Sequence, residues 1–102
     1  MANITQPTKS TNVPAIVAVA GTAIASNVNR LGWQIQNVGS NALFVNYGGT
    51  ASATVFHTVL KAGSGDSDGT GGSTGQMSGT IFTGTITVAG TTPKFVVLEH
   101  TG

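Results

Sequence analysis

Apolar and polar residues alternate along two neighbouring stretches near the middle of the chain, residues 31–36 and 42–47. An alternation of period two is typical of a strand with one buried and one exposed face. The apolar positions are Leu31, Trp33, Ile35, Leu43, Val45 and Tyr47. Residues 38–41, between the two stretches, include the turn-forming residues Gly, Ser and Asn. The pattern therefore predicts two strands joined as a hairpin, with Trp33 in the core.

Four further stretches rich in Val, Ile, Thr and Phe are predicted to be strands. They are Ala15–Ala20, continued by Thr22–Ser26 beyond a kink at Gly21, then Val55–Leu60, Thr80–Val88 and Lys94–His100. Glycine-rich turns separate them, and no stretch has the 3.6-residue period of a helix. The last strand has apolar residues at both odd and even positions, so we expect it to be covered on both faces. The chain is thus predicted to be all-β, a single-domain β-sandwich of Greek-key or jelly-roll type.

Two segments do not have the composition of a packed strand. Residues 1–12 are polar and mixed, which predicts a flexible N-terminal arm ahead of a β-sandwich domain over residues 13–102. Gly63–Gly75 consists almost wholly of Gly, Ser, Thr and Asp, so we expect it to be mobile unless a partner orders it.

Charged residues are few. Only 7% of the 102 residues are charged and the net charge is +1, whereas about 25% is usual in soluble proteins. Little electrostatic repulsion then keeps copies apart, which favours an assembly of several copies. The four cations are scattered, so no nucleic-acid partner is expected. The apolar run Ala15–Ala20 is too short to span a membrane or to act as a signal sequence.

Three groups of residues match the residue types of catalytic or metal sites without the required context. Gly71–Gly75 matches G-x-S-x-G, but a nucleophile elbow needs a strand before it and a helix after it. Asp66–Gly69 resembles the start of a calcium loop, but Met77 stands where the closing Glu is expected. His57 and His100 are far apart in sequence, and there is no cysteine. We therefore expect no enzymatic activity, no catalytic residue, no cofactor and no metal.

Three residues are the candidates for contacts with a partner. Phe44 lies on the opposite strand face from its apolar neighbours, which makes it the best candidate for an exposed apolar contact. Tyr47 could serve with Phe44 as a stacking surface for a sugar. Arg30 precedes the amphipathic strand and could pair with a partner carboxylate, although a solvated position at the strand end is the simpler interpretation. The hydroxyl row Thr83, Thr85, Thr87 is interpreted as a face of a β-ladder toward solvent or a neighbour.

Several of these segments form a pattern that occurs in a known group of proteins. They are Arg30–Asn37, Leu43–Val45, Gly48–Ala51, Leu60–Gly63 and Phe95–Glu99. The sequence of these segments resembles small bacteriophage virion structural proteins of the capsid decoration or head-fibre type. The resemblance covers roughly residues 29–62 and the last strand, and it supplies no catalytic residues.

The resemblance implies a capsid decoration or cement subunit that binds the particle surface in many copies. Its partners would then be the major capsid protein or other virion proteins, and its location the virion after synthesis in the host cytoplasm. A homo-oligomer is expected, with a trimer favoured by the threefold sites of capsid lattices. The alternative is a glycan-binding module of a phage tail or head fibre, for which Phe44, Tyr47 and the hydroxyl rows would be the contact residues.

Overall fold

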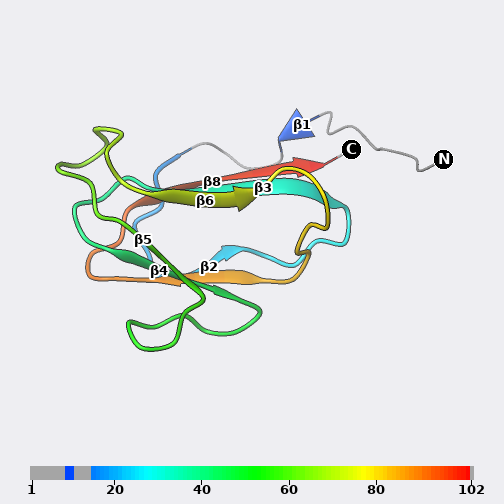
Figure 1. The fold of residues 1–102 in the computed structure, drawn as a ribbon, viewed down its shortest axis with the longest axis horizontal. Helices are drawn as coiled ribbons and strands as arrows, with labels where there is room; N and C mark the ends of the chain where they lie inside the picture. The colour runs from blue at the N-terminus through cyan, green and yellow to red at the C-terminus, as the bar shows by residue number, and fades with distance from the viewer. Residues whose placement is uncertain (1–8, 11–14, 102) are drawn as a thin grey trace.

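The computed structural model describes residues 9–10 and 15–101, which form eight β-strands in two antiparallel sheets (Figure 1). The strands are β1 (Lys9–Ser10), β2 (Gly21–Ile24), β3 (Arg30–Asn37), β4 (Leu43–Tyr47), β5 (Thr58–Leu60), β6 (Ser73–Gln76), β7 (Ile86–Ala89) and β8 (Phe95–Thr101). This part of the chain contains no helix, which confirms the predicted all-β class.

The order of the strands identifies the type of sandwich. The first sheet has the order β1-β8-β3-β6 and the second has the order β2-β7-β4-β5. Consecutive strands therefore lie in different sheets, except for β4 and β5, which pair with each other. Two four-stranded sheets interleaved in this order form a jelly roll, so the predicted sandwich is confirmed.

The core lies between the two sheets, which Figure 1 shows one above the other. Its buried members are Ile24, Trp33, Ile35, Leu43, Val45, Leu60, Ile86, Val88 and Phe95. Trp33 is 1% exposed, which confirms its predicted core position. On the other face of β8, Val96 and Leu98 are half-buried, so that strand is partly covered on both sides as expected.

The predicted hairpin between the two central strands is wrong. β3 pairs with β8 and β6, whereas β4 pairs with β7 and β5. The connection between β3 and β4 therefore crosses from one sheet to the other. Asn37 holds this crossing: its Nδ2 donates to the carbonyl of Asn41 at 2.8 Å, and its Oδ1 accepts from Gly39 N–H at 3.0 Å. Asn37 is 1% exposed, so these bonds also satisfy a buried amide.

The low-complexity segment Gly63–Gly75 contributes nothing to the core, as its composition predicts, but its backbone is bonded to this crossing. Its last residues enter β6, which pairs with β3 along residues 73–76. Earlier in the segment, Gly63 N–H donates to the carbonyl of Gly39 and Ser67 N–H to that of Val38, at 2.9 and 2.7 Å. Backbone groups make these contacts, so a segment without apolar side chains can still be held in place.

Glycine is required where β6 approaches β3. A Cβ at Gly75 would overlap the carbonyl oxygen of Trp33 and lie 2.9 Å from Gln34 Cα. Gly75→Ala should therefore push β6 away from β3 and lower the free energy of unfolding by about 1–3 kcal/mol. Urea unfolding measures this. Gly65→Ala is the matched control, because its Cβ would meet nothing closer than 3.4 Å, and an equal loss in both variants would contradict the steric account.

Two predicted strands are shorter in the structure. Val55–Leu60 is reduced to β5 because Ser52 Oγ accepts the N–H of Val55 at 2.9 Å and closes a turn before the strand. Thr80–Val88 is reduced to β7; in the part ahead of β7, the carbonyls of Phe82 and Gly84 accept from a side chain and not from a neighbouring strand. That side chain belongs to Arg30, described below.

The N-terminal part of the described chain also differs from expectation. Ala15–Ala20 is not a strand but forms one antiparallel bridge, between Val17 and Phe95. β2 then begins at Gly21, whose φ of 127° favours glycine, and ends at Ile24. Within the predicted arm, residues 1–8 and 11–12 lie outside the described residues. Within this range only Lys9–Ser10 are described, and they form β1, whose backbone pairs with β8 at the edge of the first sheet.

Candidate functional site

An exposed apolar patch covers the outer face of β4 and β5. Phe44 is half-buried, and its ring centroid lies 4.9 Å from that of Phe56. Val59 stands opposite Phe44 in the β4–β5 register. Phe56 is 40% exposed, Val59 48% and Val55 56%. Phe44, Val55, Phe56 and Val59 together are called the Phe56 patch.

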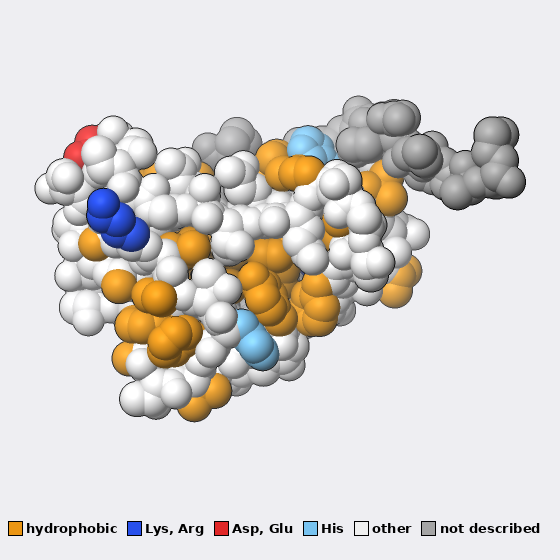
Figure 2. All heavy atoms as spheres, viewed as in Figure 1, with side chains coloured by type: hydrophobic (Ala, Val, Ile, Leu, Met, Phe, Trp, Pro, Cys, Tyr) orange, Lys and Arg blue, Asp and Glu red, His pale blue; other side chains and the backbone are white. Residues whose placement is uncertain are grey.

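The surroundings of the Phe56 patch are largely uncharged. Figure 2 shows hydrophobic side chains gathered at the lower left, over the β4–β5 region, with one basic side chain (blue) above them and uncharged polar surface elsewhere around them. Phe44 was the only member predicted from the sequence. The patch also needs Phe56 and its neighbours, which the shortened β5 leaves exposed in the preceding turn.

Tyr47 lies at a different place, in an aromatic cluster at the end of β4. Its ring centroid is 5.7 Å from that of Trp33, edge to face, and 5.7 Å from that of Phe82. On the other side it stacks on His57 at 5.3 Å. Tyr47, Gln76 and Phe82 line a cleft of about 250 Å³, which we call the Tyr47 cleft.

The polar groups of the Tyr47 cleft are largely used within the chain. Gln76 Oε1 accepts from Trp33 Nε1 and from the N–H of Phe82, each at 2.9 Å. Its Nε2 donates to the carbonyl of Thr80 at 3.3 Å. His57 Nδ1 accepts the N–H of Tyr47 at 3.1 Å. The other ring nitrogen, Nε2, therefore carries the N–H of the neutral imidazole and can donate a hydrogen bond. The cleft therefore offers mainly ring surface and a few polar atoms at its rim.

Arg30 is not available to a partner. Its side chain is 0% exposed, and its Nε donates to Glu99 Oε2 at 2.7 Å. The remaining donors reach three carbonyls, those of Ala25, Phe82 and Gly84, at 2.6, 2.7 and 3.0 Å. Both the solvated position and the partner contact predicted for Arg30 are therefore wrong. The carboxylate that it pairs with lies on β8, the neighbouring strand of the same sheet, 69 residues further along the chain.

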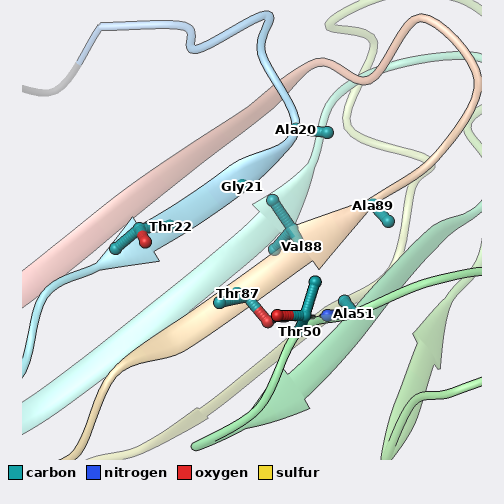
Figure 3. A pocket seen from close by; sticks show the side chains of 8 residues that line it. All are labelled: Ala20, Gly21, Thr22, Thr50, Ala51, Thr87, Val88 and Ala89. Carbon is teal, nitrogen blue, oxygen red and sulfur yellow. Dashed lines mark hydrogen bonds between the residues drawn. The ribbon is translucent and has the colours of Figure 1, made fainter.

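The predicted hydroxyl row on one long strand is not formed either. Only Thr87 lies in β7, where it is 8% exposed. Its hydroxyl donates to the carbonyl of Gly49 at 2.7 Å and accepts from Ala51 N–H at 2.9 Å, which holds a loop against the sheet. A groove of about 360 Å³ lies beside this loop, and small side chains line most of it (Figure 3). Its residues are Ala20, Gly21, Thr22, Thr50, Ala51, Thr87, Val88 and Ala89.

The residues that matched catalytic or metal motifs have ordinary structural positions. Ser73 lies in strand β6 opposite Gln36, not at a turn between a strand and a helix. Asp66 pairs with Lys94, and the hydrogen bond and the positive charge of Lys94 hold the pKa of Asp66 below its usual value. A hydrogen bond from the Thr70 hydroxyl likewise lowers the pKa of Asp68. Among the described residues no three His, Asp or Glu side chains gather as metal ligands would, and no helix there is long and apolar enough to cross a membrane.

Comparison with known proteins gives no further guide to this site. No protein-family model, curated protein or solved structure matches the chain.

Proposed function

We propose that the chain is a structural protein of a bacteriophage virion, a capsid decoration or cement subunit that binds the particle surface in many copies. The Phe56 patch is the observation that carries the proposal. Phe56 and two valines are exposed beside the half-buried ring of Phe44, on a chain of which only 7% is charged. Exposed apolar clusters of this kind are typical of surfaces that bind another protein. The partner would be the major capsid protein or another virion protein.

The fold and the resemblance support the same proposal. Jelly rolls occur in capsid proteins and in lectins, so the fold agrees with the proposal by analogy and does not single it out. The activity would be binding alone, on the outside of a particle assembled in the host cytoplasm. Each contact can be weak, because attachment at many points raises the overall affinity without new contacts.

Phe56→Asp should weaken binding to particles that lack the protein by roughly 10- to 100-fold. The variant loses the burial of the exposed part of the Phe56 ring and places an unpaired carboxylate in the contact, and each 1.4 kcal/mol lost corresponds to a factor of ten. Cosedimentation of purified protein with such particles measures the affinity. Val28→Asp is the control, because Val28 is 87% exposed and lies outside the patch. Equal binding by the parent protein and Phe56→Asp would contradict the assignment of the patch.

A glycan-binding module of a tail or head fibre is the second candidate, and the Tyr47 cleft favours it. The half-buried ring of Tyr47 beside Phe82 is a surface on which a sugar could stack. A glycan array separates the two functions. Retention of one class of sugar, lost in His57→Ala, would support the glycan module over the decoration subunit.

A further inference from the structure

A short segment between β1 and β2 exposes an unbroken run of apolar side chains. All six residues of Ala15–Ala20 are exposed, with Ile16 at 53%, Val17 at 36% and Val19 at 71%. The run contains no charge and no proline. A run of this length is unusual on the surface of a monomer unless it serves an interaction.

The backbone of this segment is paired on one side only. Val17 N–H donates to the carbonyl of Phe95 at 2.8 Å, and Phe95 N–H donates to the carbonyl of Val17 at 3.0 Å. In an antiparallel bridge of this kind, the neighbouring residues direct their N–H and C=O groups to the opposite side. Within the described part of the chain, the backbones of Ile16, Ala18 and Ala20 have no hydrogen-bond partner.

The open side of the segment lies at a sheet edge. Phe95 pairs with Asn37 of β3 on one side and with Val17 on the other. The segment therefore continues the edge of the first sheet at which β1 lies. Sheet edges in soluble proteins usually carry a charge, a proline or a cover that prevents another strand from pairing. Residues 15–20 contain neither a charge nor a proline.

We propose that residues 15–20 pair antiparallel with the same residues of a second copy, about a twofold axis at Ala18. The free backbone groups belong to even-numbered residues, so the bonded pairs would be Ala18 with Ala18 and Ile16 with Ala20. Val17 would then stand opposite Val19 of the second copy. The segment suits a second copy because it is uncharged, so two identical segments meet without charge repulsion, and because every opposed pair in this register is apolar.

This contact is independent of the Phe56 patch, which lies on the second sheet. It joins the first sheets of two copies edge to edge, as in other cases of strand addition. A twofold contact produces a dimer, whereas the trimer expected from the resemblance would need a different contact.

Val19→Lys should turn a dimer into a monomer at high micromolar concentration, as measured by sedimentation velocity. A charged side chain at this edge would be forced against Val17 of the second copy, and exposed Val19 can be replaced without loss of the fold. Val28→Lys is the matched control: it makes the same change at an 87% exposed valine and should remain a dimer. Circular dichroism of both variants verifies that they are folded.

A second variant tests the register itself. Opposed residues in a non-bonded antiparallel pair have Cα atoms about 4.5 Å apart, within the range of a disulfide. The double variant Val17→Cys, Val19→Cys should therefore form a disulfide-linked dimer on oxidation, and neither single variant should, since the chain has no other cysteine. A parent protein that is a monomer or a trimer would overturn the proposal. A dimer that Val19→Lys leaves intact would do so as well. Neither result bears on particle binding through the Phe56 patch.

Discussion

Replacing Trp33 with Ala should lower the free energy of unfolding by about 3–5 kcal/mol, the usual loss on removing a large buried aromatic side chain. Trp33 is 1% exposed at the centre of the core. It also contacts Tyr47 edge to face and donates its indole N–H to Gln76. The loss would be a large part of the stability of a small domain, which is typically 5–15 kcal/mol. Urea unfolding followed by circular dichroism measures it.

Trp33→Phe is the control for this variant, because it keeps an aromatic ring in the core and removes only part of the buried volume, together with the hydrogen bond to Gln76. Its loss should be clearly smaller than that of Trp33→Ala. A Trp33→Ala protein that unfolds like the parent would contradict the core position, and if it also lost binding to a sugar it would favour the glycan-binding alternative.

Replacing Arg30 with Met should destabilise the domain by about 3–5 kcal/mol, the range for removing one partner of a buried ion pair. Glu99, 7% exposed, would lose its guanidinium partner. Three carbonyls would also lose a donor, those of Ala25, Phe82 and Gly84. These carbonyls lie in the segments before β3 and before β7, so both segments should loosen and the Tyr47 cleft, which contains Phe82, should be disturbed.

Arg30→Lys separates the charge of Arg30 from its geometry. Lysine keeps the positive charge but lacks the planar fork that reaches four acceptors, so it should restore only part of the stability lost in Arg30→Met. Thermal unfolding of the three proteins at equal pH gives the comparison. Full stability in Arg30→Met would show that the buried pair and its carbonyl contacts contribute little to the fold.

The sequence pattern predicts which residues face the core better than it predicts which strands pair. Alternation in residues 31–36 and 42–47 places Trp33, Ile35, Leu43 and Val45 inside, and the structure agrees. The same alternation arises, however, whether two successive strands pair in one sheet or lie in the two opposite sheets of a sandwich, because each strand buries one face in both arrangements. The turn-like residues 38–41 favoured a hairpin, and the side chain of Asn37 instead holds them as a crossing between the sheets.

Most other differences between the sequence-based predictions and the structure come from hydrogen bonds between residues far apart in the sequence. Arg30 donates to carbonyls 52 and 54 residues away, in the part of the predicted strand Thr80–Val88 that precedes β7 and is not a strand in the structure. Nothing near Arg30 in the sequence indicates those acceptors. Gly63–Gly75 was interpreted from composition alone, and composition does not report the backbone contacts that place it beside β3. Of the candidate contacts, Phe44 and Tyr47 are half-buried at the surface and Arg30 is buried.

Cryo-electron microscopy of phage particles that carry this protein tests the central claim most directly. We expect density for the jelly roll at equivalent positions across the capsid surface, with the Phe56 patch buried against the capsid protein. Particles with no such density, or with the jelly roll attached so that Phe44 and Phe56 face solvent, would contradict the proposed decoration function.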